Sequence, residues 1–380
     1  MASFATLDSR YRELADHARA VAAKLAPLAI DADSSSEPHP EVLSVLRDSG
    51  LIRHTVPAGY GGASDTVDPV AVCVIREILM GTCSAADSLF ALQGIGSYAI
   101  AVAGTPEQRR TWLPRVASGD VLAALALTEP EAGSDLKAIG TSARARDGLI
   151  EISGRKSFIS NAGVAGYYIV LAREDEGLSA FLVPADSAGL RAVPGPELGA
   201  PHLIGDVELR GVTVPDSARI GNPGQGLAPV LATLAVFRVS VAAAAVGLAQ
   251  TALEEATRHA RTRVQFGRPL LRLGPVAGLL ADAWADVESA RLLTYRAAEL
   301  ARDDPAAHLE HSSLAKLAAT EACCRVVDRC VQVSGRFGLI KDSRLERCYR
   351  QARPMRIYEG ASEVLRLGIA RQLASEVGQP

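Results

Sequence analysis

Residues 127–135 read LTEPEAGSD and lie where the pattern of the chain changes. Before them, apolar residues recur with the spacing of an α-helix. After them, short β-leaning runs are separated by Gly, Pro and Asp, which predicts a small antiparallel β-domain. The predicted helices on the N-terminal side are 11–28, 41–49, 69–80 and 85–103, and the predicted strands include 149–152, 167–171, 180–183 and 207–209.

One helix start close to this stretch is especially well marked. Thr105 can cap a helix whose first residue is Pro106, and Gln108 completes a capping box. We expect this helix to run towards Ala117, with Gly119 as its stop signal.

Long helical patterns return after the loop GNPGQG at 221–226. The predicted helices are 227–262, 275–303, 306–333 and 363–374. The chain therefore reads as a mainly α protein with a central β-domain. We expect a helical domain over 1–120, a β-domain over 121–225 and a helical bundle over 226–380.

Composition narrows the function classes. The net charge of −3 gives no reason to expect a nucleic-acid partner. The six cysteines form no C-x-x-C pair and no histidine cluster lies near them, so no metal site is expected. Cys323 and Cys330 share an apolar helical stripe and are predicted to be core thiols. Reduced cysteines and the lack of a signal peptide predict a cytoplasmic protein, and Arg238 within the longest apolar stretch argues against a membrane span.

The segment GIGSYA at 94–99 matches the G-x-G-x-x-A dinucleotide fingerprint. That motif binds a pyrophosphate only when a strand precedes it and a helix opens on it. Here it lies inside a predicted helix, so we interpret its small residues as sites of close helix packing.

Composition alone leaves the role of LTEPEAGSD open. Its hydroxyls and small residues can present backbone N–H groups to an anionic ligand, but they also suit a polar connecting loop. The full string resembles the T-E-P-x-A-G-S-D signature of the acyl-CoA dehydrogenases. Four further segments resemble elements of that family in the same order, so the likeness extends from about residue 10 to 375. They are KSFISN at 156–161, RVQFGRPL at 263–270, QVSGRFG at 332–338 and IYEGASE at 357–363.

The resemblance implies an N-terminal helical domain, a middle antiparallel β-domain and a C-terminal four-helix bundle, with FAD as cofactor between the last two. Family members are usually dimers or tetramers whose FAD spans the interface, so a homodimer or homotetramer is expected. By position, the flavin or its phosphates would meet Leu127, Thr128, Gly133, Ser134, Phe158 and Ser160, while a neighbouring subunit would supply Arg263, Phe266, Gln332 and Gly335.

Glu359 precedes a predicted helix, where an acidic side chain also suits the positive end of the helix dipole. The resemblance implies a catalytic role instead: a base removes the α-proton of an acyl thioester while FAD accepts the β-hydride. Some members place this base directly before the arginine matched by Arg238, but here that residue is Phe237, which cannot accept a proton. Glu359 is therefore the predicted base, with Arg238, Tyr358 and Gly360 on the substrate side.

Three positions depart from the family pattern. Ala235 stands where many relatives have an Asp that helps to hold pantetheine, Arg336 replaces a glycine, and Ala361 replaces a Thr. The substrate is thus either an acyl-CoA or an acyl group on a carrier protein. A flavin monooxygenase and a non-catalytic flavin-binding subunit are the remaining alternatives. The electron acceptor expected from the family is an electron-transfer flavoprotein, although another acceptor fits the sequence equally well.

Overall fold

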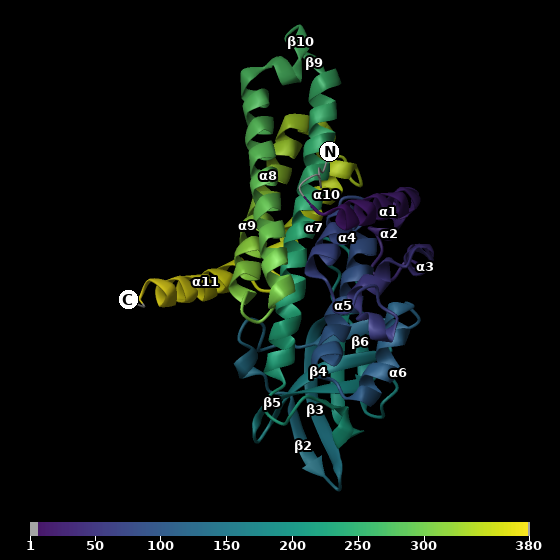
Figure 1. Cartoon of the computed structure of the whole chain (residues 1–380). Helices are drawn as coiled ribbons and strands as arrows, with labels where there is room; N and C mark the ends of the chain where they lie inside the picture. The colour runs from purple at the N-terminus through teal and green to yellow at the C-terminus, as the bar shows by residue number, and fades with distance from the viewer. Residues whose placement is uncertain (1–6, 379–380) are drawn as a thin grey trace. The chain divides into compact units, whose positions relative to one another are not determined.

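The computed structural model describes residues 7–378, and its elements follow the predicted order of helices, strands and helices (Figure 1). The prediction of a mainly α protein with a central β-domain is confirmed. The α-helices are α1 (Ser9–Leu25), α2 (Ala29–Ala32), α3 (Pro40–Ser49), α4 (Pro69–Met80), α5 (Ser84–Ala103), α6 (Pro106–Ala117), α7 (Leu227–Thr262), α8 (Gly274–Asp303), α9 (Leu309–Ser334), α10 (Arg344–Met355) and α11 (Ser362–Val377). The strands are β1 (Ala123–Ala126), β2 (Ser142–Arg146), β3 (Leu149–Ser160), β4 (Tyr167–Glu174), β5 (Gly177–Pro184), β6 (Leu190–Pro194), β7 (Ile204–Pro215), β8 (Arg219–Ile220), β9 (Val264–Gln265) and β10 (Arg268–Pro269).

The chain forms two compact units. The first comprises Met1–Ser34, Pro69–Asp87 and Arg238–Pro380, and the second comprises Ser35–Asp68 and Ser88–Phe237. The helices α5 and α7 each contribute residues to both units. The division into domains 1–120, 121–225 and 226–380 stays a prediction.

One sheet organises the second unit, in the order β6-β7-β3-β2-β4-β5-β8, with β1 beside β4. The strands β4 and β5 are buried along nearly their whole length, which explains why their sequences are continuously apolar. Most strand pairs are antiparallel, as predicted, but β1 runs parallel to β4, with Ala123 opposite Tyr167. The sequence did not reveal β1 because its residues AALA favour a helix, and pairing with β4 overrides that preference.

The helix α6 begins and ends as predicted. The Thr105 hydroxyl accepts a hydrogen bond of 3.1 Å from the Gln108 N–H, and the Gln108 carboxamide oxygen accepts one of 2.8 Å from the Thr105 N–H. These two bonds form the capping box. Gly119 lies just beyond the helix at φ +76°, a conformation that favours glycine.

The glycines of the GIGSYA segment serve close packing inside α5, as predicted. A Cβ atom on Gly96 would lie 2.6 Å from Ala123 Cβ, so β1 can approach this helix only at a glycine. A Cβ atom on Gly94 would lie 2.1 Å from Cζ of Phe237. Phe237 is fully buried and meets Tyr98 edge to face, with ring centroids 6.0 Å apart.

Small side chains build the core of the first unit. Buried alanines such as Ala243 in α7, Ala298 in α8 and Ala319 in α9 let the helices pack closely. The helices α8 and α9 lie side by side along much of their length (Figure 1). Cys323 and Cys330 are fully buried in this core, which confirms the prediction of core thiols.

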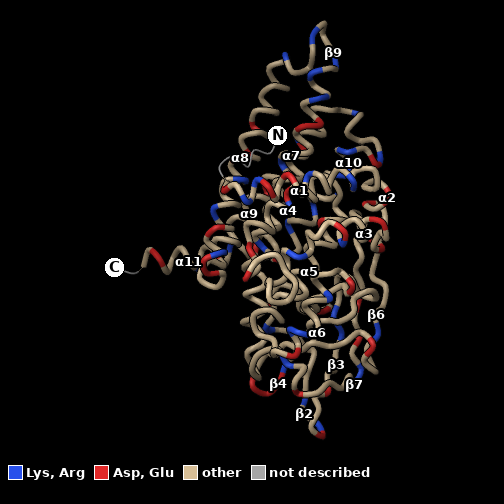
Figure 2. Tube along the Cα trace, turned by 45° about the vertical axis from the view of Figure 1, so that its right-hand side comes forward, with Lys and Arg blue, Asp and Glu red and all other residues tan. Residues whose placement is uncertain are grey.

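Two C-terminal helices differ in how they pack. The sequence did not reveal α10, because it is largely polar and buries only a narrow apolar stripe that includes Leu345, Cys348 and Met355. By contrast, α11 buries only Ser362 and Leu365 and projects away from α8 and α9 (Figures 1 and 2).

In the part of the chain that the structure describes, two helices are long and apolar enough to cross a membrane by length and composition alone. They are α5 and α7, whose most apolar windows are 72% and 83% buried within the structure. A mostly buried core helix of a soluble protein passes the same test, so these two helices are weak evidence for a membrane span.

Candidate active site

Glu359 lies on a short turn between α10 and α11, in a backbone conformation that is unusual for its residue type. Its φ is +56°, and the φ of Gly360 is +106°. A residue with a side chain is strained in this left-handed region, and such strain often marks a functional position. At Gly360 a Cβ atom would lie 2.9 Å from Cδ2 of Leu365, so the turn has little room for a side chain in place of this glycine.

Two cations, the half-buried Arg238 and the buried Lys316, hold the carbonyl oxygens of this turn. Arg238, in α7, donates from Nε to the Glu359 carbonyl oxygen at 2.9 Å and from Nη1 to Ser313 Oγ at 2.9 Å. Lys316, in α9, donates from Nζ to the Gly360 carbonyl oxygen at 2.7 Å. The structure thus brings Arg238, Glu359 and Gly360 together, and their contact with a substrate stays a prediction. Lys316 was not predicted from the sequence, where an isolated lysine in an apolar helical stretch was the available signal.

The Glu359 carboxylate lies in surroundings that disfavour its charge. The residue is partly exposed, but Oε2 is buried and has no hydrogen-bond partner. Burial raises the pKa of Glu359 above its usual value of 4.5, although the positive charges of Arg238, Arg76 and Lys316 act in the opposite direction. Arg76 is itself engaged, because its guanidinium binds both carboxylate oxygens of Asp87 at 2.9 and 2.7 Å. A carboxylate whose pKa is raised is a stronger base than an ordinary carboxylate.

In the second unit, a buried lysine fastens the LTEPEAGSD loop to β3. Lys156 Nζ donates to the Leu127 carbonyl oxygen at 3.0 Å and to Glu129 Oε1 at 2.8 Å. The Glu129 carboxylate also accepts the N–H groups of Gly140 at 2.6 Å and Thr141 at 3.0 Å. Burial acts to raise the pKa of Glu129, but hydrogen bonds from Lys156 and Thr141 lower it overall. Buried hydrogen bonds and an ion pair therefore hold the loop in place.

The predicted flavin contacts of this loop lie close to that anchor. The Thr128 carbonyl oxygen accepts the Ser157 N–H at 2.8 Å, which joins the loop to β3 a second time. Gly133 and Ser134 are exposed, and a Cβ atom on Gly133 would meet no heavy atom within 4 Å. These two residues can therefore be approached by a ligand.

Two further predicted flavin contacts follow on β3. Phe158 is 59% exposed and has φ +56°, beside an irregularity in the pairing of β3 with β7. Ser160 Oγ lies 2.9 Å from Nε2 of His202, whose pKa is lowered by burial, so the imidazole is neutral at neutral pH. His202 carried no signal in the sequence, because it lies in an irregular loop 42 residues after its partner.

The residues predicted to serve a neighbouring subunit lie on an exposed part of the first unit. Phe266 is 90% exposed in the turn between β9 and β10. The Arg263 guanidinium lies over the ring of Phe337, 5.8 Å from its centroid, two residues beyond Gly335. Gln332 is exposed near the end of α9, and Gly335 has φ +56° with open space where a Cβ atom would stand. The hairpin and the end of α9 therefore meet at Phe337.

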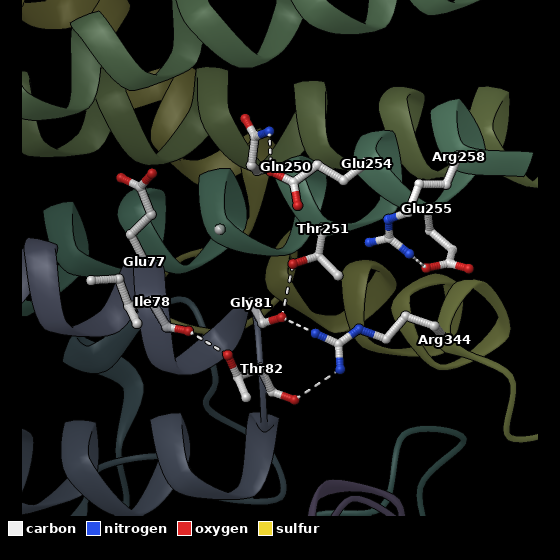
Figure 3. Close-up of a pocket in the computed structure, with 11 residues that line it drawn as sticks. Glu77, Ile78, Gly81, Thr82, Gln250, Thr251, Glu254, Glu255, Arg258 and Arg344 are labelled. Atoms are coloured by element: carbon white, nitrogen blue, oxygen red, sulfur yellow. Dashed lines mark hydrogen bonds and ion pairs between the residues drawn. The ribbon is translucent and has the colours of Figure 1, made fainter. Parts of the chain in front are cut away.

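A polar cavity of about 460 Å³ lies among α4, α7 and α10 (Figure 3). Arg344 spans one side by donating to the carbonyl oxygens of Gly81 and Thr82, and Thr251 Oγ1 donates to the Gly81 carbonyl oxygen at 2.8 Å. None of the predicted site residues lines this cavity. Within residues 7–378, no group of three or more His, Cys, Asp or Glu side chains is arranged to hold a metal ion.

Three family models cover most of the chain. They are described as the acyl-CoA dehydrogenase N-terminal domain, over residues 8–120, the middle domain, over 124–212, and the C-terminal domain, over 224–374. A curated relative, the cyclohexane-1-carbonyl-CoA dehydrogenase of Geobacter metallireducens, is 34% identical over 360 residues, which are 93% of this chain and 94% of the relative.

Solved structures agree with this similarity. A glutaryl-CoA dehydrogenase from Mycobacterium smegmatis in complex with FADH2 has a TM-score of 0.92 at 27% identity, covering 98% of this chain and 97% of its own. A chain of the structure described as the electron transferring flavoprotein of Acidaminococcus fermentans has a TM-score of 0.91 at 28% identity, covering 97% and 98%. The prolyl acyl carrier protein oxidase AnaB has a TM-score of 0.89 at 26% identity, covering 97% and 99%.

Proposed function

Because the chain belongs to the acyl-CoA dehydrogenase family, it is an oxidoreductase acting on CH–CH donors, and we propose that it desaturates an acyl thioester with Glu359 as the catalytic base. One observation carries this proposal: a carboxylate oxygen is buried without a hydrogen-bond partner, on a left-handed turn whose carbonyl oxygens are held by Arg238 and Lys316. A buried carboxylate oxygen without a partner is costly, so its presence points to chemistry rather than to stability.

The residues of the chain fit FAD as the cofactor. The exposed ring of Phe158 can lie against a flat ring system, and Ser160 beside it carries a hydroxyl. The exposed backbone at Gly133 and Ser134 can bind anionic or carbonyl oxygens. Hydrogen bonds from β3 hold the backbone of Leu127 and Thr128 in the same loop. FAD, when bound, accepts the β-hydrogen of the acyl group as hydride.

The part played by Glu359 is removal of the α-proton. The α C–H bond breaks, the proton passes to the carboxylate, and the electron pair forms the α,β double bond as the β C–H bond breaks on the other side. Burial keeps the protonated form of Glu359 stable enough to receive that proton. The backbone N–H of Glu359 is proposed to bind the thioester carbonyl oxygen, as it does in the family.

We also propose a homodimer or homotetramer in which the hairpin of one subunit reaches the FAD of another. Phe266 is 90% exposed, and exposed arginines lie before and after it along the chain, around the β9–β10 hairpin of the first unit (Figure 2). They are Arg261, Arg263, Arg268 and Arg272. Arginine binds phosphate oxygens in pairs, which suits the pyrophosphate of FAD. Light scattering of the holoprotein tests this assembly, and a monomer with full FAD content would contradict it.

The carrier of the acyl group is the main alternative within this reaction. Ala235 has no polar side-chain group to hold a pantetheine arm, and the similar structure of AnaB is that of a carrier-protein oxidase. We therefore propose CoA as the first candidate and an acyl carrier protein as the second. The proposed electron acceptor is an electron-transfer flavoprotein, and the proposed location is the cytoplasm, which subcellular fractionation tests.

Anaerobic titration of the holoprotein with acyl-CoA and with acyl-carrier substrates tests the reaction. The expected result is loss of flavin absorbance with one carrier class, and no such loss at a comparable rate in Glu359→Gln. A flavin monooxygenase would give an oxygen-dependent product, and a non-catalytic subunit would bind FAD without reduction by any thioester. Either result would overturn the proposal.

A further inference from the structure

A buried ammonium group lies directly behind the Glu359 turn. Lys316 is 0% exposed, and its Nζ donates to the carbonyl oxygen of Gly360 at 2.7 Å. Burial of an ammonium group carries a large desolvation penalty that its partners offset only in part, whereas an apolar side chain of similar length carries no such penalty. Packing alone therefore does not account for a lysine at this position.

Lys316 and Arg238 each bind one carbonyl oxygen of the turn. They come from α9 and α7, and they bind two consecutive carbonyl oxygens, those of Gly360 and Glu359. A left-handed conformation is strained for a residue such as Glu359. Hydrogen bonds from charged donors are stronger than those from neutral donors, so the two bonds can offset that strain. Without Lys316, one of the two fixed points of the turn is lost.

The cations bind the backbone and leave the carboxylate free. Arg238 and Lys316 both donate to carbonyl oxygens, and Glu359 Oε2 stays buried without a partner. An ion pair with the carboxylate itself would hold the proton acceptor in its charged form and weaken it as a base. The two cations thus fix the backbone of the turn without binding the carboxylate that would accept the proton.

The charges around Lys316 make its effect measurable. Burial lowers the pKa of Lys316 to about 8, and the positive charge of Arg238 acts in the same direction. The negative charges of Glu359, Glu321 and Glu363 act to raise it. In return, the positive charge of Lys316 acts to lower the pKa of Glu359. Removal of this charge therefore moves the titration of Glu359 to higher pH.

We infer that Lys316 is a positioning residue of the active site: its bond to the Gly360 carbonyl oxygen fixes the turn that presents the Glu359 carboxylate. This inference rests on the proposed function of Glu359. Lys316 does not touch the reacting atoms, and it acts through the turn.

Three variants of the holoprotein test the inference. Lys316→Met keeps the length of the side chain and removes the charge and the donor, and Lys316→Arg keeps both. Thr320→Val is the control, because Thr320 is equally buried one turn further along α9, and its hydroxyl donates to the backbone carbonyl oxygens of Lys316 and Leu317 within that helix. Stopped-flow measurement of flavin reduction gives the rate and the apparent substrate affinity across pH. Infrared difference spectra of each variant against the same variant with Glu359→Gln give the titration of Glu359 without substrate.

Lys316→Met should slow flavin reduction by about tenfold to 100-fold, since displacement of a reacting group by 1 Å has an effect of this size. Substrate affinity should change far less, and Lys316→Arg should recover part of the rate. The acid limb of the pH profile and the infrared titration should both move to higher pH in Lys316→Met and stay in place in Thr320→Val. Unchanged rate and titration in Lys316→Met, or a loss of stability alone, would overturn the inference. If no thioester reduced the wild-type flavin, the proposed function would fail, and the infrared titration would still decide whether Lys316 acts on Glu359.

Discussion

Replacement of Gly94 by alanine tests how closely α5 packs against the start of α7. The added Cβ atom would lie 2.1 Å from Cζ and 2.2 Å from Cε1 of Phe237, whereas carbon atoms in contact are usually about 3.5–4.0 Å apart. The Phe237 ring would have to retreat by roughly 1.5 Å to restore that spacing. It is fully buried and has Tyr98 against it edge to face, so it has little freedom to move.

The expected loss of stability is about 1–3 kcal/mol, the usual effect of overpacking a core. A matched control separates this clash from the helix preference of alanine. Gly278 lies inside α8, and a Cβ atom there would meet nothing within 4 Å. Gly278→Ala should therefore stabilise the protein by about 0.5–1 kcal/mol. Urea unfolding followed by circular dichroism should show the two variants moving in opposite directions.

A second substitution makes the test specific for Phe237. Phe237→Leu shortens the side chain that Gly94→Ala would strike, so the double variant should be more stable than the sum of the two single changes predicts. Strict additivity would refute the proposed contact, and so would a Gly94→Ala variant that gained as much stability as Gly278→Ala.

Three further predictions concern the candidate site. Glu359→Gln should slow flavin reduction by about 10²–10⁴-fold. Because burial raises the pKa of Glu359 in the folded state, the charged form destabilises the folded protein, and the substitution should increase the free energy of unfolding above pH 4.5. Well below that pH the free energy of unfolding should be unchanged, as urea unfolding across pH will show. Lys156→Met should cost about 3–5 kcal/mol in urea unfolding, because it leaves Glu129 buried without its cation, and a smaller loss than that of an exposed pair would contradict the anchoring role. Phe266→Ala should weaken FAD binding about tenfold in flavin fluorescence titrations, while the stability of the protein without FAD changes by less than about 0.5 kcal/mol, because the side chain is 90% exposed.

The parts of the fold that sequence predicted best are those fixed by local chemistry. The capping box of Thr105 and Gln108 depends on residues three positions apart, and it forms as expected. The limits of α4 and α7 follow from apolar periodicity and from breaks in it. The strand β1 could not be found in this way, because its four residues AALA become a strand only through their pairing with β4.

The candidate site shows the same division. The residue types at Glu359 and Gly360 stand in a motif that can be read directly from the sequence. Their shared left-handed conformation and the two cations behind them cannot be read in this way, because Arg238 and Lys316 are 121 and 44 residues from the carbonyl oxygens that they bind. The His202 contact with Ser160 is hidden for the same reason.

The burial of Lys156 and Lys316 also affects whether their amines can react with acyl thioesters. Acyl thioesters can transfer their acyl group to a neutral amine, and a lysine of lowered pKa holds more of that neutral form than an ordinary one. The pKa is lowered at both Lys156 and Lys316, yet both side chains are 0% exposed. The other three lysines of the chain, Lys24, Lys137 and Lys341, are exposed. A protein that handles acyl thioesters thus keeps these two amines out of reach of its own substrates.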